Sequence, residues 1–175
     1  MTVAEGGSRG QQAGYGLGVS SSHPFVEPVG FLLGEWAGSG EGLWSPGFSF
    51  SDHVVFTGDD EGGRPIVEMR QVTTGADGAP SHSEVGFLMC RPDGAVFATV
   101  AQPSGITEAL AGRVSAPERL ELSSVEIGHA PETDPVTATA RRLYLEDGSL
   151  VLEVDISVGN EGLAPHTRSV LRRVG

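Results

Sequence analysis

The side chains of this sequence that could hold a metal ion or exchange protons are few and scattered. Its five histidines are His23, His53, His82, His129 and His166. No two of them have the local spacing of a zinc site. No G-x-S-x-G motif marks a serine nucleophile, and the single cysteine can form no internal disulfide. Metal chemistry in this chain would therefore depend on one histidine ligand rather than on a cluster.

The charge of the chain excludes several classes of protein. Its 11 basic residues are all arginine, so a Schiff-base lysine and a P-loop lysine are both excluded. The net charge of −12 repels phosphate backbones and anionic membrane surfaces, so we expect neither nucleic acid nor membrane as a partner. No apolar run is long enough to span a bilayer, and the first residues do not resemble a signal peptide. We expect a cytoplasmic protein, which fits the lone Cys90.

The chain divides into an arm and one domain. Residues 1–23 are rich in Gly, Ser and Gln and cannot bury enough apolar area to offset the entropy of ordering, so we expect a disordered N-terminal arm. Residues 24–175 are of the right length for one globular domain. At its start, VEPVGFLLGEW holds a short apolar cluster that predicts one or two helical turns ending at Gly34, which could plug one end of the domain.

The rest of the domain reads as short strands separated by turns. Runs such as SDHVVFTG, PIVEMRQVTT and LVLEVDISVG alternate with turn segments, of which RPDG (91–94) and EDGS (146–149) suit tight hairpins. With the glycine-rich strand described next, there are about ten strands at the regular spacing of a sandwich or barrel. Short connections favour antiparallel neighbours. We predict an all-β fold, an antiparallel up-and-down β-barrel of about ten strands.

One strand carries glycine at alternate positions. In GEWAGSGEGLWSP, Gly34, Trp36, Gly38, Gly40, Gly42 and Trp44 share one face. Glycine in a strand costs about 0.5–1 kcal/mol relative to Ala. Two interpretations are open at this point. The glycines could simply relieve crowding where a barrel bends, or they could let another group approach the backbone. Either use favours a closed barrel over a sandwich.

Four segments resemble the nitrobindin family of small haem-binding β-barrels, which are similar in shape to fatty-acid-binding proteins. The glycine strand matches the family pattern G-x-W-x-G-x-G-x-G-x-Y-P, HSEVGF (82–87) and PSGITE (103–108) resemble two further family segments, and HTRSVLRR resembles the last strand. The resemblance covers residues 26–174, with the four segments in family order. One departure stands out: this chain has Trp44-Ser45-Pro46 where the family has Tyr-Pro, so an indole N–H donor replaces a phenol.

The resemblance implies a function and a set of site residues. It implies that His166 is the axial ligand of a ferric haem b, and that Gly34, Trp36, Gly38, Gly40, Gly42 and Trp44 line the cofactor. It also implies binding of nitric oxide and isomerisation of peroxynitrite to nitrate, with no catalytic residue beyond the haem iron. Arg168, Arg172 and Arg173 could meet the haem propionates or be surface charge.

Other roles stay open for the barrel and its histidines. A barrel of this size could hold a fatty acid or another small apolar ligand instead of haem, or it could be filled and serve as a partner-binding domain. His82 could bond Glu84 or line the pocket, whereas His53 and His129 are expected at the surface. A homodimer is compatible with the haem and lipid interpretations, although the sequence shows no clear interface patch.

Overall fold

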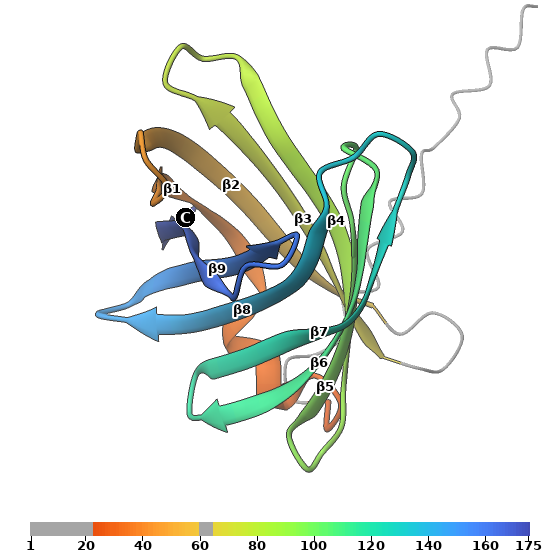
Figure 1. Ribbon diagram of the computed structural model, residues 1–175. Helices are drawn as coiled ribbons and strands as arrows, with labels where there is room; N and C mark the ends of the chain where they lie inside the picture. Colours follow the sequence, from red (N-terminus) through yellow and green to blue (C-terminus); the bar gives the residue numbers. More distant parts are fainter. Residues whose placement is uncertain (1–22, 60–64) are drawn as a thin grey trace, which may run out of the picture.

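The computed structural model describes residues 23–59 and 65–175, and it contains one short 3-10 helix and ten strands (Figure 1). Along the chain these are η1 (Glu27–Leu32), β1 (Gly34–Gly42), β2 (Phe48–Asp59), β3 (Ile66–Gly75), β4 (Pro80–Cys90), β5 (Ala95–Ala101), β6 (Ile106–Ala116), β7 (Arg119–His129), β8 (Val136–Glu146), β9 (Ser149–Val158) and β10 (Ala164–Arg173). The predicted arm, except His23, lies outside the described residues. No helix within these residues is long and apolar enough to cross a membrane.

The strands form a closed antiparallel barrel in which each strand pairs with its neighbours in the chain and β1 pairs with β10. This confirms the predicted up-and-down barrel of ten strands. We call one end of the barrel the loop end; it carries the connections 43–47, 76–79, 102–105, 130–135 and 159–163. The opposite end is the η1 end. Because β1 rises about 3.3 Å per residue, its first and last residues lie at opposite ends of the barrel.

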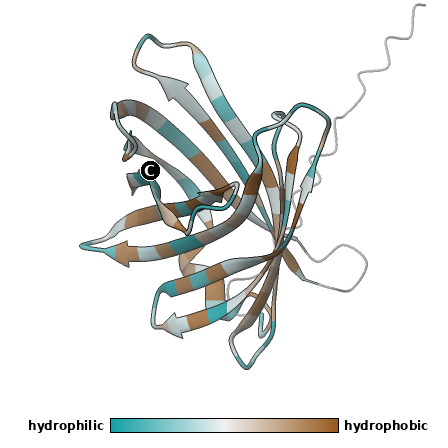
Figure 2. Cartoon of the chain, viewed as in Figure 1, coloured by the Kyte–Doolittle hydropathy of each residue, from teal (hydrophilic) through white to brown (hydrophobic). Residues whose placement is uncertain are grey.

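The helix η1 closes its end of the barrel, as the plug prediction expected. Val29 and Leu32 on η1 are buried in one apolar cluster with inward residues of the strands. Trp36 belongs to the same cluster, and its indole N–H donates to the carbonyl of Leu32 at 2.7 Å. The guanidinium of Arg173 lies 4.3 Å from the centre of the Trp36 ring and donates to the carbonyl of Leu33 at 2.6 Å. Figure 2 shows apolar residues alternating with polar ones along the strands around this core.

The barrel wall has a seam between β7 and β8. These strands pair from Arg119↔Tyr144 to Ser123↔Ala140, whereas β7 continues to His129 and β8 begins at Val136. Beyond the paired part, the backbone N–H of Thr139 donates to the hydroxyl of Ser124 at 2.9 Å. Figure 1 shows the two strands diverging towards their connecting loop. The wall is therefore bonded less completely at the seam than along the neighbouring ladders.

The glycines of β1 make room for neighbouring strands. A Cβ added at Gly38 would clash with the backbone of Val170 on β10. At Gly40 and Gly42 it would clash with the rings of Phe50 and Phe48, their direct partners on β2. An aromatic side chain that covers a cross-strand glycine recovers packing which the glycine lacks. In this structure the close approach that the glycines allow is thus used by a strand backbone and two phenyl rings.

The Gly38 contact predicts a specific loss of stability. Gly38→Ala should lower the free energy of unfolding by about 1–3 kcal/mol, because β1 and β10 must move apart to admit a methyl group. Gly162→Ala is the matched control, since a Cβ there meets nothing within 4 Å, and it should change stability by less than about 0.5 kcal/mol. Urea unfolding followed by tryptophan fluorescence measures both. Equal effects of the two substitutions would contradict the packing role of Gly38.

Candidate functional site

A β-bulge places His166 at the loop end of the barrel. On β10, Pro165 pairs with Asp155 and Thr167 pairs with Val154, so His166 is an extra residue with no partner in the ladder to β9. Bulges of this kind re-aim a side chain and are common beside functional sites. The carbonyl of His166 accepts a hydrogen bond from the N–H of Leu43 at 2.8 Å. The position is therefore fixed by backbone bonds on the β1 side while its side chain is left available.

The imidazole of His166 is suited to bind a metal. Its Nδ1 is buried and has no hydrogen-bond partner within the described part of the chain. Burial, and then the charge of His82, lower the pKa of His166 below the ordinary histidine value, so the ring is neutral at pH 7. The ring of Trp44 meets it edge-on, with the ring centres 4.7 Å apart. A neutral imidazole without a competing hydrogen bond is the form of histidine that metals bind.

The structure brings together only part of the predicted site. Gly42 and Trp44 lie at the loop end with His166, and Gly40 precedes them on the same inward face. Gly34 and Trp36 lie at the η1 end, where Trp36 supports the helix. Phe48 and Phe50, which no sequence motif marked, lie beside Gly40 and Gly42 with their tilted rings 5.8 Å apart.

A buried ion-pair network crosses the inside of the barrel. Arg141 on β8 donates to both oxygens of Glu84 on β4, at 2.6 and 2.9 Å. It also donates to both oxygens of Glu108 on β6, once from Nε at 3.2 Å and once through a short bond from Nη2. All three side chains are less than 10% exposed. Burial raises the pKa of Glu84, but the opposing effects of Arg141 and His82 hold it well below the usual range of a carboxyl group.

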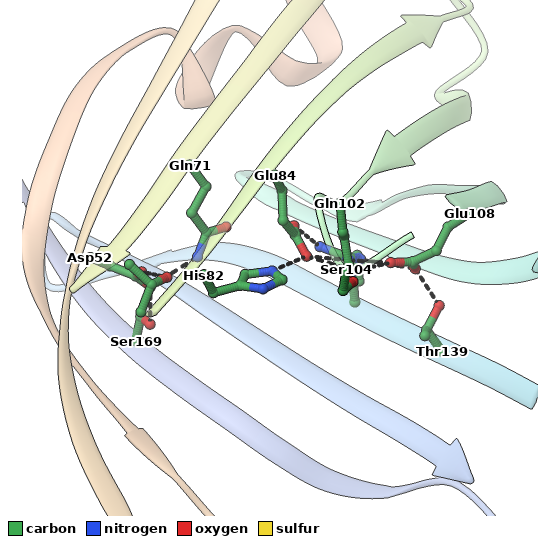
Figure 3. Close-up of polar contacts among 11 residues, drawn as sticks. Asp52, Gln71, His82, Glu84, Gln102, Ser104, Glu108, Thr139 and Ser169 are labelled. Atoms are coloured by element: carbon green, nitrogen blue, oxygen red, sulfur yellow. Dashed lines mark hydrogen bonds and ion pairs between the residues drawn. The ribbon is translucent and has the colours of Figure 1, made fainter. Parts of the chain in front are cut away.

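Neutral donors complete this network (Figure 3). The amide of Gln102 donates to Glu84 at 3.1 Å and to Glu108 at 3.2 Å, and the hydroxyl of Thr139 donates to Glu108 at 2.5 Å. His82 Nε2 lies 3.1 Å from Glu84 Oε1, which is the pairing that the sequence suggested. Each carboxylate therefore has several donors, as a buried charge requires.

A second buried carboxylate lies at the same level of the barrel. Asp52 on β2 accepts from Thr73 at 2.5 Å, from Gln71 at 3.0 Å and from Ser169 at 2.5 Å. Figure 3 shows this cluster beside the first. We call the two clusters together the polar layer. The apolar core lies on its η1 side, and His166 follows on its loop side.

The interior of the barrel has little free space on the η1 side of the polar layer. A cavity of about 40 Å³ lies there, lined mainly by apolar side chains such as Met69, Leu88 and Leu122, with Arg141 and Gln71 at its polar boundary. Sites for drug-sized ligands have volumes of about 300–1,000 Å³. The cavity is too small for a porphyrin or a fatty-acid chain. Any cofactor bound through His166 therefore lies on the loop side of the polar layer.

The sequence left open whether the arginines of the last strand meet haem propionates or are surface charge, and the structure favours surface charge for Arg168. Arg168 lies 3.4 Å from both Glu146 and Glu153, in a partly exposed group of charges. Arg173 is at the η1 end against Trp36. Strand alternation explains the difference, because Arg168 points to the face opposite its inward neighbours Thr167 and Ser169. A role for Arg168 or Arg173 at a haem carboxylate is not supported.

The polar layer could not be recognised as a whole from the sequence. Its one available signal was a carboxylate at an inward position of an otherwise apolar face, as in SEVGFL around Glu84 and ITEAL around Glu108. The partner on β8 could not be found from spacing, since Arg141 is 57 residues from Glu84 and 33 from Glu108. Only barrel closure brings the three side chains together.

The fold and site together define a small antiparallel β-barrel that carries at one end a histidine whose Nδ1 has no hydrogen-bond partner in the described part of the chain. Comparison with known families agrees with this description. Residues 25–173 match the model of the THAP4-like, heme-binding beta-barrel domain. The chain belongs to this family, which confirms the resemblance to haem-binding barrels.

Relatives and a solved structure support the same assignment. The chain is 33% identical over 156 residues to a peroxynitrite isomerase of Arabidopsis thaliana, with 87% of this chain and 90% of the relative covered. It is 36% identical over 160 residues to peroxynitrite isomerase 1 of Mycobacterium tuberculosis, with 86% and 95% covered. The crystal structure of Rv2717c from M. tuberculosis is similar with a TM-score of 0.77 and 36% identity, over 87% of this chain and 99% of that one.

The ion-pair network predicts an asymmetric response to mutation. Arg141→Met should destabilise the protein by about 3–5 kcal/mol at pH 7, because two buried carboxylates lose their partner. Arg142→Met is the control, since its pairs with Glu153 and Asp155 are partly exposed and should contribute about 0–1 kcal/mol.

Lowering the pH should reduce the difference in free energy of unfolding between wild type and Arg141→Met. The wild-type pKa of Glu84 lies below its unfolded value, so its stabilisation is present at neutral pH and is lost as the pH falls towards the folded pKa. In the variant, burial without Arg141 raises that pKa, so Glu84 protonates earlier. Urea unfolding of both proteins at pH 4, 5.5 and 7 measures this difference in free energy of unfolding. A difference in free energy of unfolding that does not change with pH would contradict the electrostatic role of Arg141.

Proposed function

We propose that the protein binds ferric haem b through His166. The observation that carries this proposal is the buried Nδ1 of His166, which has no hydrogen-bond partner among the described residues. A bulge also sets His166 apart from the ladder, and its imidazole is neutral at pH 7. A resident metal ligand explains why such a nitrogen is left unpaired. Membership of a haem-binding family supports the same cofactor. The b type and the ferric state are part of the proposal.

The residues around His166 suit a large flat apolar cofactor. Trp44, Phe48 and Phe50 supply aromatic surface at the loop end, and Phe48 is 49% exposed. Exposed aromatic side chains gathered beside an available ligand are a feature of cofactor sites. The haem iron would supply Lewis-acid and redox chemistry. The polar layer beneath would fix the depth at which a cofactor stops.

The activity that we propose is isomerisation of peroxynitrite to nitrate, together with binding of nitric oxide. Its support is the naming of relatives that cover most of this chain as peroxynitrite isomerases. In this proposal the iron performs the chemistry, and no side chain acts as nucleophile or as an obligatory general base. The alternative of a lipid-binding barrel has no such support, since neither the family description nor the names of these relatives refer to a lipid.

We also propose a cytoplasmic location and a homodimer. Burial raises the pKa of the Cys90 thiol to about 12, so this free cysteine is unreactive and fits a reducing compartment. The outer face of β4 and β5 exposes Phe87, Met89 and Phe97, and two hollows of about 390 and 320 Å³ both have Phe87 in their lining. Exposed apolar patches of this kind mark contact surfaces. A second copy of the chain is the occupant that we propose.

The haem proposal predicts a saturable Soret band. Titration of the purified protein with ferric haem should saturate at about one haem per chain, and His166→Ala should abolish or shift the band because the axial ligand is removed. His53→Ala is the matched control, since His53 is on the surface and its side chain is 46% exposed. Peroxynitrite decay, followed by stopped-flow absorbance, should be accelerated only by the haem-loaded wild type and control.

Two outcomes separate the parts of this proposal. Weak, unsaturable haem binding that is the same in wild type and His166→Ala would overturn the haem site. Saturable binding that depends on His166, without any acceleration of peroxynitrite decay, would retain the haem site and overturn the isomerase activity.

The dimer proposal predicts a change in mass on mutation. Phe87→Arg should convert a dimer into a monomer, since it places a charge in the centre of an apolar contact. Val170→Arg is the control: Val170 is similarly exposed, but β10 lies across the barrel from β5. Light scattering coupled to size exclusion at about 50 μM gives the mass of each. A wild type that elutes as a monomer would contradict the dimer.

A further inference from the structure

The polar layer is interrupted where β9 passes between its two clusters. The hydrogen bonds of Asp52 join β2, β3 and β10, whereas those of Arg141 join β4, β6 and β8 (Figure 3). In the barrel, β9 lies between β8 and β10. At this level it presents Val154, which pairs with Arg141 on one side and with Thr167 on the other. An apolar side chain therefore separates the two polar clusters on this side of the interior.

The cavity of about 40 Å³ extends into this interruption. Its lining begins with Met69 and Leu88 in the apolar core and continues to Val154 and Thr167. Thr167 faces inward directly after His166 in the chain, at the loop end of the barrel. The cavity therefore reaches from the apolar core, past the polar layer, to the vicinity of the site that we propose for a cofactor.

The wall of the cavity suits an apolar occupant better than water. Most of it consists of the aliphatic side chains of Leu, Val, Ala and Met. The polar side chains at its boundary direct their donors elsewhere: Gln71 and Ser169 donate to Asp52 at 3.0 and 2.5 Å, and Arg141 donates to two buried glutamates. A buried water needs about two to four polar partners, and cavities with apolar walls stay dry. The donors around this cavity are already engaged.

The size and charge of the cavity limit what it can hold. A molecule of liquid water occupies about 30 Å³, so a cavity of about 40 Å³ admits one molecule of only a few atoms. An anion would gain nothing there, because the donors of Arg141 that face the cavity are directed to Glu84 and Glu108. An uncharged gas molecule needs no hydrogen-bond donor. Size and polarity together favour a neutral diatomic gas.

We propose that this cavity is a binding site for one small neutral gas molecule, which enters from the loop end beside Val154 and Thr167. Binding is non-covalent, so no bond forms or breaks. The gas site itself needs no haem. Its use by nitric oxide rests on the proposed haem function, because a ligand released at the loop end would find a second position inside the barrel. An anionic ligand would not be admitted to that position.

The first test uses xenon and the protein without haem. Xenon is apolar and binds in dry protein cavities. Methyl ¹H–¹³C spectra recorded at increasing xenon pressure report which side chains the gas contacts. We expect saturable shifts at Met69, Leu88 and Leu122, which line the cavity. A water in the cavity that xenon does not displace would overturn the proposal. Shifts confined to the outer hollows beside Phe87 would also overturn it.

Matched substitutions on β5 locate the xenon. Val100→Ile adds a methylene group to a side chain that lines the cavity, so we expect the saturable shifts to be lost. Val96→Ile is the control, since it makes the same change on the same strand at a buried position that does not line the cavity. It should bind xenon as wild type does. Ala98→Val fills the cavity from a second position and should reproduce the loss. Equal xenon binding by all four proteins would overturn the proposal.

The second test asks whether the cavity opens to the loop end. Nitric oxide is released from the haem-loaded protein by a laser pulse, and its rebinding is followed at the Soret band. We expect a slow phase of internal rebinding in wild type and Val96→Ile, and its loss in Val100→Ile or under xenon. Xenon binding without such a phase would overturn the opening to the loop end. Failure of the wild type to bind haem would overturn the proposed function and leave the xenon result unaffected.

Discussion

The bonds between Arg141 and the two carboxylates of Glu84 and Glu108 govern the interior of this barrel. Taking three charges out of water costs several kcal/mol for each ion, and only a full set of donors offsets that cost. Here the set is full, since Gln102, Thr139 and His82 occupy the remaining acceptor positions. Such a network tolerates no partial assembly. The inward faces of β4, β6 and β8 must therefore reach their native register together.

The same network divides the barrel into two parts with different properties. On the η1 side, an apolar core supports the helix and retains a cavity of about 40 Å³. On the loop side lie the rings of Trp44 and Phe48 and the imidazole of His166, whose Nδ1 has no hydrogen-bond partner among the described residues. A packed base and an adaptable rim are a common arrangement in binding proteins, because the base holds the geometry and the rim meets the ligand. In this barrel the boundary between them is ionic.

Much of the fold could be predicted from the sequence, because it rests on local signals. Alternation and turn residues identified the ten strands, and the apolar cluster before Gly34 identified η1. The candidate role of His166 followed from resemblance, but the bulge that leaves it without a ladder partner has no sequence signal, since it depends on pairing with β9. The role of the β1 glycines was left open between a bend and a bound group, and the structure shows Phe48 and Phe50 against two of them. Contacts between residues distant in the sequence, such as that of Arg141 with Glu84, require the closed barrel to be known first.

The seam between β7 and β8 makes the barrel wall unequal in its resistance to widening. A complete ring of hydrogen-bonded strands resists widening equally around its circumference, since every ladder must stretch. Here the loop-end halves of β7 and β8 are joined by a bond from Thr139 to Ser124, rather than by a ladder. Outward bending of the wall would therefore cost least at that gap, because fewer backbone hydrogen bonds have to stretch there. Because the hydroxyl of Thr139 also donates to Glu108, bending at the seam would disturb the buried ion pairs of the polar layer.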